Sequence, residues 1–261
     1  MHWQNLSGTW VLLPPTPIGI IHFIGGAFIG SAPQLTYRWL LEQLAQAGFA
    51  VIATPFDSGF DHKALARNSF NRFEGVLQRL QASGAIRQRY LPVYGLGHSV
   101  GCKLHLLGGS LFGPERAGNM LLAYNNFPVR RAVPFGDRFN WTSALDLEFD
   151  PSPKQTRELI AQNYAIRRNL LVAFDNDTLD QSRELVPMLQ AQFPELVVRQ
   201  QLPGNHLTPL TQELNWDAGE AFSPLDALGQ WLKQRLDRDL KQLRCELLSW
   251  LNPAAFASAP R

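Results

Sequence analysis

Short apolar runs alternate with amphipathic stretches along most of this chain. Six runs are rich in aliphatic and aromatic residues, and each has the length of a buried strand. Stretches with helical periodicity separate several of them. Continuous apolar strands separated by helices are typical of a mostly parallel sheet that helices cover on both faces, so we predict an α/β fold. The six expected strands are residues 18–24, 49–56, 90–97, 118–127, 169–174 and 196–202.

Two of the helices between these strands have recognisable faces. Residues 32–48 predict one helix, with Leu35, Trp39 and Leu44 roughly on one side and Gly48 as its stop signal. A second helix has apolar residues at helical spacing, and we expect Asp61 to cap its start. These apolar residues are Phe70, Phe73, Leu77 and Leu80.

Residues 127–165 interrupt the alternation with a long connection between the fourth and fifth strands. A connection of this length inside a compact domain is usually functional. We therefore expect a single domain over residues 1–261 with a small lid inserted at 127–165, the last part of which, 153–164, is helical. Its aromatic residues either line an apolar pocket or pack the insertion onto the domain. They are Phe127, Phe135, Phe139, Trp141 and Phe149.

The C-terminal part predicts one long amphipathic helix. Ser223 and Pro224 are favourable at a helix start, and Asp226 completes an S-x-x-D cap. The charged residues of this helix indicate a solvated face rather than a membrane surface. Its apolar stripe consists of Leu225, Leu228, Leu232, Leu236, Leu240, Leu243 and Leu247.

Composition and charge narrow the class of protein. The formal net charge is only +2, with no basic stripe, which argues against a nucleic-acid partner. The N-terminus has no secretory pattern, and no apolar run is long enough to cross a bilayer, so we expect a cytoplasmic protein without a transmembrane segment. Cys102 and Cys245 are expected to be reduced, and neither has neighbours suited to a metal site. We predict no cofactor and no metal.

Residues 97–101, Gly-His-Ser-Val-Gly, fit the pattern G-x-S-x-G between an apolar run and a helical one. This pattern predicts a sharp turn that raises a serine hydroxyl above the sheet edge, with glycines where side chains would collide with neighbouring elements. The following helix directs its first N–H groups toward developing negative charge. A plain strand–helix junction is the alternative, but the order strand, turn, helix favours the elbow. Ser99 is therefore the candidate nucleophile.

A nucleophilic serine needs a base and an acid, which follow it in the order acid, then histidine, in folds of this kind. Only one of the six histidines, His206, lies late in the sequence, just past the last predicted strand. A surface histidine is the alternative interpretation. The acid is expected after the fifth strand, where the sequence offers three aspartates. We favour Asp177, which has room to turn toward a histidine loop, with Asp180 as the second choice and Asp175 as the third.

Two backbone donors would have to stabilise an oxyanion. One is expected from the N–H of Val100, directly after the serine, and the other from the loop after the first predicted strand, at Ala27 or Gly26. Glycine in that loop lets the backbone approach a tetrahedral centre closely, although a tight turn would also favour it.

Further polar residues lie near the same sheet edge. Asn125 and Asn126 end the fourth strand, where they either orient a substrate or cap a turn. Arg130 and Arg131 are more simply solvent-facing than anion-binding. His62, after the expected cap, is a minor candidate for a second acid–base group.

Several motifs together resemble a known family. They are GIIHFIGGAFIGSAPQLTYRWLLEQLAQAGFAVIATPF, GLGHSVGCKLHLL, NNF, FDPSPKQT, NLLVAFDNDTLDQS and GNHLTPL, between residues 19 and 210. In combination they resemble the DUF1350 family, an uncharacterised α/β-hydrolase-like group from cyanobacteria and plant plastids. The resemblance implies the α/β-hydrolase fold and, by analogy, a serine hydrolase mechanism, but no substrate. The sequence His22-Phe23-Ile24-Gly25-Gly26 departs from the direct His-Gly of many α/β-hydrolases, which leaves the loop donor open by one residue.

The leading hypothesis is therefore a serine hydrolase that cleaves an ester or thioester, including a lipophilic one. Its partner would be a small-molecule or lipid-like substrate. The alternative is a non-catalytic protein of the same fold that binds an apolar ligand. The sequence does not determine the oligomeric state.

Overall fold

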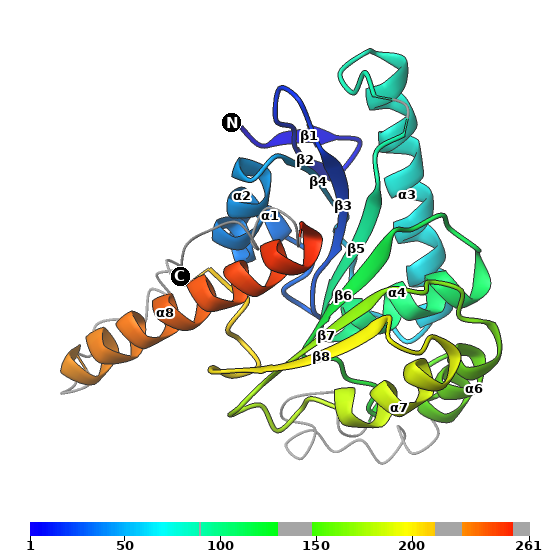
Figure 1. The fold of residues 1–261 in the computed structure, drawn as a ribbon, viewed down its shortest axis with the longest axis vertical. Helices are drawn as coiled ribbons and strands as arrows, with labels where there is room; N and C mark the ends of the chain where they lie inside the picture. The colour runs from blue at the N-terminus through cyan, green and yellow to red at the C-terminus, as the bar shows by residue number, and fades with distance from the viewer. Residues whose placement is uncertain (89, 130–147, 212–225, 253–261) are drawn as a thin grey trace.

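The computed structural model describes residues 1–88, 90–129, 148–211 and 226–252, with the backbone alone for 226–236. Within these residues the chain forms an eight-stranded sheet in the order β1-β2-β4-β3-β5-β6-β7-β8 (Figure 1). Strand β2 pairs antiparallel with both β1 and β4, and every other pairing in the sheet is parallel. The strands are β1 (Gln4–Leu6), β2 (Thr9–Leu12), β3 (Gly19–Ile24), β4 (Phe49–Ala53), β5 (Val93–His98), β6 (Gly118–Leu122), β7 (Asn169–Phe174) and β8 (Val197–Leu202).

The six strands predicted from apolar runs are confirmed as β3 to β8, with ends shifted by a few residues. The edge hairpin of β1 and β2 was missed, because its strands have only three and four residues and β1 is largely exposed. Its turn carries the signal that could have shown it. Ser7 and Gly8 both have positive φ, 54° and 78°, as two-residue hairpin turns require.

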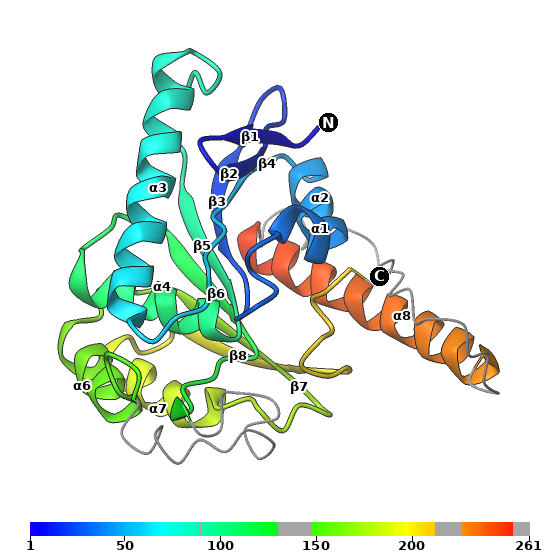
Figure 2. The ribbon, with the colours of Figure 1, turned by 180° about the vertical axis from the view of Figure 1, so that it is seen from behind.

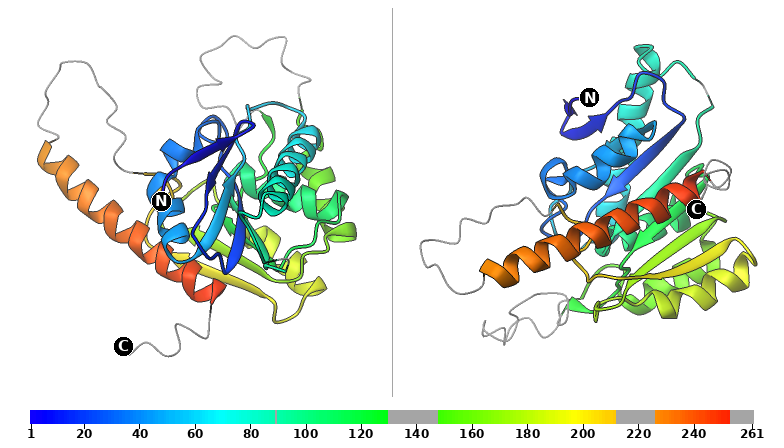
Figure 3. Two further views of the ribbon diagram at one scale, coloured as in Figure 1. Left: turned by 90° about the horizontal axis from the view of Figure 1, so that it is seen from above. Right: turned by 60° about the vertical axis from the view of Figure 1, so that its left-hand side comes forward.

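Helices cover both faces of the sheet, as predicted, and Figures 1 and 2 show the two layers from opposite sides. Helices α1 (Pro33–Thr36), α2 (Arg38–Gln46) and α8 (Asp226–Leu251) lie on one face. The other face carries α3 (His62–Ala82), α4 (Val100–Leu111), α6 (Pro153–Asn163) and α7 (Ser182–Gln192). Figure 3 shows α8 running beside α1 and α2.

Alternation along β3 shows how the sheet forms two cores. Ile21 and Phe23 pack into the core beneath α2 and α8, whereas Ile20 and Ile24 pack into the cores on the opposite face. Successive side chains of a strand point to opposite faces, so a strand covered on both sides is mostly apolar. All six residues of β3 are buried.

The helix expected over residues 32–48 differs from the prediction. The chain forms two helices there, α1 and α2, which meet at Tyr37. Of the predicted face, Leu35 is wrong because it is 52% exposed, whereas Leu44 is buried and Trp39 packs against the core. The fully buried residues of this region are Tyr37, Leu40, Leu41 and Leu44.

The expected lid lies partly outside the described residues, namely at 130–147, so the lid stays a prediction. Its helical end is confirmed as α6, which begins with a capping box between Ser152 and Gln155. Helix α6 packs into the layer of α4 and α7 through Ile160. The start of the C-terminal helix at Ser223 also lies outside the described part, whereas Leu240, Leu243 and Leu247 pack against the sheet as expected. No helix in the described ranges is both long and apolar enough to cross a membrane.

Candidate active site

Ser99 occupies a strained turn between β5 and α4. Its φ and ψ are 56° and −121°, a combination that non-glycine residues rarely adopt. The Ser99 N–H donates to the Leu122 carbonyl at 2.9 Å, which ties the turn to the neighbouring strand β6. Ser99 is therefore held above the carboxyl edge of the sheet at the N-terminus of a helix, which is the geometry that the motif predicts.

The two glycines of the motif allow this turn to pack closely. A Cβ atom on Gly101 would lie 2.1 Å from the Ile24 carbonyl oxygen, and one on Gly97 would lie 2.7 Å from the Cys102 nitrogen. Both contacts are with backbone, which a side-chain rearrangement cannot relieve. The spacing G-x-S-x-G is thus a steric requirement of the way in which α4 packs on β3 and β5.

Three residues that are distant in the sequence meet at this edge. The Ser99 Oγ lies 3.1 Å from His206 Nε2, and His206 Nδ1 lies 2.8 Å from Asp177 Oδ2. Because a carboxylate only accepts hydrogen bonds, Nδ1 carries the proton and Nε2 is left to accept from the serine hydroxyl. The structure therefore brings Ser99, His206 and Asp177 into one hydrogen-bonded chain.

The environment of Asp177 favours its charged form. Burial on its own would raise the pKa of this carboxyl, but hydrogen bonding and attraction to His206, together with the Leu179 N–H, lower it overall. That N–H donates to Asp177 Oδ1 at 2.8 Å. The other two aspartates do not contact His206: Asp175 is exposed, and Asp180 accepts from the Ser182 hydroxyl at 2.6 Å before α7.

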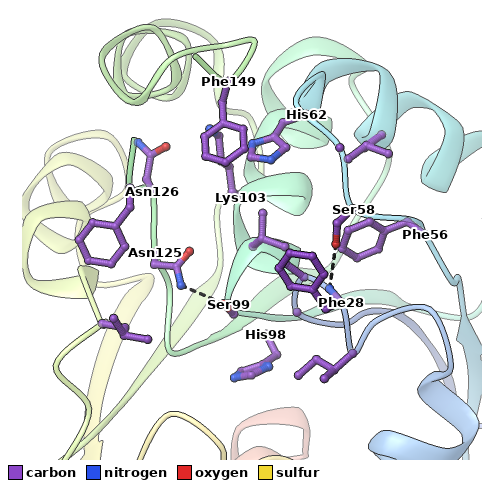
Figure 4. A pocket seen from close by; sticks show the side chains of 18 of the residues that line it. Phe28, Phe56, Ser58, His62, His98, Ser99, Lys103, Asn125, Asn126 and Phe149 are labelled. Atoms are coloured by element: carbon purple, nitrogen blue, oxygen red, sulfur yellow. Dashed lines mark hydrogen bonds between the residues drawn. The ribbon is translucent and has the colours of Figure 1, made fainter. Parts of the chain in front are cut away.

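Asn125 adds a second contact to the serine. Its Nδ2 donates to Ser99 Oγ at 2.8 Å (Figure 4). The hydroxyl hydrogen of Ser99 stays available for His206, because the amide occupies only an oxygen lone pair. The structure shows Asn125 in contact with the serine itself, which is neither of the two uses that the sequence left open. Its neighbour Asn126 instead bonds to the start of α6, where its Nδ2 donates to the Pro153 carbonyl at 2.9 Å.

The backbone donors around Ser99 differ in their availability. The Gly26 N–H is engaged, because it donates to the Tyr37 hydroxyl at 2.8 Å. The N–H groups of Ala27 and Val100 have no hydrogen-bond partner among the described residues. Of the two candidates in the early loop, Ala27 is therefore the one with a free donor.

A buried hydrogen-bond chain, which sequence reasoning missed, connects the two loops beside Ser99. Tyr37 Oη lies 2.7 Å from His98 Nδ1, and His98 Nε2 lies 2.9 Å from the His206 carbonyl oxygen. Since that carbonyl can only accept, Nε2 of His98 donates and Nδ1 accepts from the tyrosine. Burial lowers the pKa of His98 to about 3, so this ring is neutral near pH 7. The chain therefore runs from Gly26 through Tyr37 and His98 to His206, and only the tertiary structure reveals it.

A cavity of about 600 Å³ opens over Ser99. Most of its wall is apolar, and it includes Phe127 and Phe149 from the segment predicted to cover the site. His62 also lines it, one residue after Asp61, which caps α3 by accepting from the Ala64 N–H at 2.7 Å. The other candidates in the predicted lid lie outside the described residues, namely Arg130, Arg131, Phe135, Phe139 and Trp141.

Three of the solved structures with the same architecture are enzymes by their names. Carboxyl esterase 2 of the mycorrhizal fungus Tuber melanosporum is 16% identical, with a TM-score of 0.56 over 89% of this chain and 82% of that one. Fluorophosphonate-binding serine hydrolase F of Staphylococcus aureus is 14% identical, with a TM-score of 0.54 over 92% and 96%. Dienelactone hydrolase of Anabaena variabilis is 16% identical, with a TM-score of 0.50 over 92% and 98%. These likenesses confirm the α/β-hydrolase fold.

The sequence comparisons place the chain more narrowly. No curated protein matches it. The profile of a family described as "protein of unknown function (DUF1350)" matches residues 2–253, which is nearly the whole chain. The chain therefore belongs to the DUF1350 family, as its motifs indicated.

Proposed function

We propose that this protein is a serine hydrolase that cleaves an ester or thioester through an acyl-enzyme. The observation that carries the proposal is the chain from Ser99 Oγ to His206 Nε2 at 3.1 Å and from His206 Nδ1 to Asp177 Oδ2 at 2.8 Å. A serine hydroxyl is a weak nucleophile unless a base removes its proton during attack. Here His206 Nε2, which faces the serine, carries no proton and can accept one. The carboxylate of Asp177 orients the ring through Nδ1.

The proposed reaction has two stages. In the first, Ser99 Oγ attacks the carbonyl carbon while His206 Nε2 takes the hydroxyl proton. Collapse of the tetrahedral intermediate breaks the bond to the leaving alcohol or thiol, which receives that proton from His206. In the second stage His206 removes a proton from water, the resulting hydroxide attacks the acyl carbon, and the proton returns to Ser99 as the carboxylic acid leaves.

The negative charge of the intermediate would be stabilised by the N–H groups of Val100 and Ala27. Both donors are free among the described residues, and the Val100 N–H lies at the positive end of α4. Gly26 takes a supporting role in this proposal, because its N–H anchors the loop to Tyr37. The charge on Asp177 stabilises the imidazolium form of His206 during both stages.

Several observations support a small, partly apolar ester or thioester as the substrate. The cavity of about 600 Å³ has a mostly apolar wall with a few polar groups directed into it, which is typical of small-molecule sites. Proteins with this fold include an esterase and a fluorophosphonate-binding hydrolase. Their substrates do not transfer to this chain, so the acyl group must be argued from its own residues.

Labelling with a fluorophosphonate probe tests the proposal. We expect the native protein to form a covalent adduct at Ser99 and the Ser99→Ala variant to form none. Ser58→Ala is the matched control, because Ser58 lines the same cavity but its Oγ accepts from the Phe28 N–H at 2.8 Å. A native protein that refuses the probe would overturn the proposal, and so would equal labelling of the Ser99→Ala variant.

The apolar wall of the cavity also favours a second candidate, a non-catalytic protein that binds an apolar ligand. This function predicts that Ser99→Ala protein retains a long-chain fatty acid and that native protein does not turn over short-chain p-nitrophenyl esters. Turnover that Ser99→Ala abolishes would exclude it.

A further inference from the structure

A lysine shares the cavity with Ser99. Lys103 lies on α4 one helical turn beyond the serine, so it faces the same side of the helix, and it lines the same cavity. Figure 4 shows Lys103 grouped with His62 and Phe149 on one side of Ser99, with His98 on the other side. This arrangement places a cationic side chain inside a mostly apolar site.

The ammonium group of Lys103 is buried with little compensation. The residue is 1% exposed, and its Nζ donates to the Pro151 carbonyl at 3.1 Å. An ammonium has three hydrogens, and no second hydrogen-bond partner and no carboxylate within ion-pair distance is present in the described ranges. Only the face of Phe149 adds an attractive contact, with Nζ 5.4 Å from the ring centroid.

The contact with Pro151 does not by itself explain a buried lysine. That carbonyl also accepts from the Thr156 hydroxyl at 3.3 Å, so it has a partner without Lys103. Burying an ammonium carries a desolvation cost that an apolar side chain of similar length would avoid. Desolvation lowers the pKa of Lys103 to about 7, although the charges of Asp150 and Glu148 act in the opposite direction. The ammonium thus has hydrogen-bonding capacity that the protein leaves unused.

Two neighbours on the cavity wall also have unused polar atoms. His62 is 5% exposed, stacks on Phe149 with centroids 4.2 Å apart, and has no partner for its Nδ1 in the described part. Burial, followed by repulsion from Lys103, lowers the pKa of His62 to about 3, so the ring is neutral near pH 7. Asn126 is also 5% exposed, and its Oδ1 is unpartnered within the same described residues. Lys103 and His62 therefore both contact the ring of Phe149, and each has hydrogen-bonding capacity that the described residues leave unused.

The direction of the reaction decides which part of the substrate reaches Lys103 and His62. In the proposed mechanism His206 protonates the leaving group, so the leaving group lies on the His206 side of Ser99. His206 packs beside His98, with ring centroids 5.0 Å apart, and Lys103 lies on the opposite side of Ser99 from His98. The acyl chain must therefore extend toward Lys103, with its methylene groups between apolar walls.

We propose that Lys103, assisted by His62, binds a carboxylate at the far end of the acyl chain, so that the substrate is an ω-carboxyacyl ester or thioester. The inference rests on the proposed hydrolase function and deepens it. A carboxylate has two oxygens, which fit the two unused ammonium hydrogens of Lys103 or one of them together with the imidazole of His62. Its charge neutralises a buried cation, whereas a neutral chain end would leave that cation uncompensated.

The test compares esters that differ only in this terminal group. The monoethyl esters of glutaric, adipic and suberic acid are each paired with the ethyl ester of the corresponding terminal amide, which is neutral and of equal size. For native protein at pH 6 we expect kcat/KM to favour the carboxylate at the best chain length by about tenfold to a hundredfold, as for a charge-assisted hydrogen bond. Because His206 acts on both esters alike, its contribution to kcat/KM cancels in the ratio of the two values.

Two further measurements identify Lys103 as the source of the preference. In the Lys103→Met variant the ratio should fall to about one, whereas Lys154→Met, at an exposed lysine on α6, should keep it. In native protein the ratio should decline as the pH rises through about 7, because kcat/KM reports ionisation of the free enzyme and Lys103 loses its proton there. The decline is measured on native protein. It therefore tests the role of Lys103 even if the Lys103→Met variant does not fold.

The outcomes separate the two proposals. If fluorophosphonate labels Ser99 but the ratio is about one at every chain length, or is unchanged in Lys103→Met, the carboxylate subsite is wrong and the hydrolase function stands. If the preference exists but does not decline above pH 7, Lys103 is not its source. If neither labelling nor hydrolysis of any ester occurs, both proposals fail.

Discussion

The hydrogen bonds that connect Gly26, Tyr37, His98 and His206 lead to a prediction. It distinguishes a role in positioning the groups around Ser99 from a role in stability alone. Tyr37→Phe removes one hydroxyl, which accepts from the Gly26 N–H at 2.8 Å and lies 2.7 Å from His98 Nδ1. The ring itself remains and keeps its packing against Phe23. Two buried polar atoms then lose their partner, namely the Gly26 nitrogen, next to the proposed oxyanion donor Ala27, and Nδ1 of His98, beside His206.

The magnitude follows from these two atoms. Leaving a buried polar group unsatisfied costs about 1–3 kcal/mol, so for two such groups we expect Tyr37→Phe to lower the free energy of unfolding by about 2–6 kcal/mol. For a chain of this length the melting temperature should fall by about 4–24 °C. Losing an oxyanion donor outright slows reactions by about a hundredfold or more. Because Ala27 would be loosened rather than removed, we expect fluorophosphonate labelling of Ser99 to slow by about tenfold.

Tyr164→Phe is the matched control. Tyr164 is also buried, accepts from Asn119 Nδ2 at 2.8 Å and donates to Asn169 Oδ1 at 2.6 Å. These partners lie in the first two residues of β6 and β7, at the sheet edge opposite Ser99. Both variants should lose similar stability in urea or thermal unfolding, but only Tyr37→Phe should slow labelling under conditions where both are folded. Equal labelling rates for the two variants would refute the positioning role of the chain.

Two other predictions concern the proposed catalytic acid and the buried histidines. Asp177→Asn should slow labelling by about 10³- to 10⁴-fold, because His206 loses the carboxylate that orients it. The control variant Asp180→Asn should change the rate by less than about threefold. Equal effects of the two variants would show that Asp177 is not the acid. The pKa of His98 and of His105 is lowered to about 3 by burial, so as the pH falls below about 6.5 the unfolded chain takes up protons that the folded chain does not. Urea unfolding should therefore show a loss of about 2 kcal/mol for each of these two residues between pH 7 and pH 5, and constant stability across this range would contradict the buried neutral state.

Residues whose position follows from local pattern could be predicted from the sequence. Strands β3 to β7 are mostly apolar, because both faces of a parallel sheet are covered. The edge strand β8 was found from its apolar ends, although Arg199, Gln200 and Gln201 lie between them. Ser99 follows from the steric rule that requires Gly97 and Gly101 at their positions. His206 and the group of three aspartates follow from their order after β8 and β7, since the carboxyl ends of parallel strands meet at one edge. The hairpin of β1 and β2 was missed because short, partly exposed edge strands have weak periodicity.

The sequence by itself determined the sheet and the elbow, because each depends on backbone sterics or burial within a few residues. It also gave the order in which the proposed nucleophile, acid and base follow one another. The tertiary structure alone decided which aspartate reaches His206 and which loop N–H stays free. It also decided that Tyr37 and His98 connect Gly26 to His206, and that Lys103 lines the cavity over Ser99. Those outcomes depend on hydrogen bonds and contacts between segments far apart in the chain, whose geometry is set only when the elements pack together.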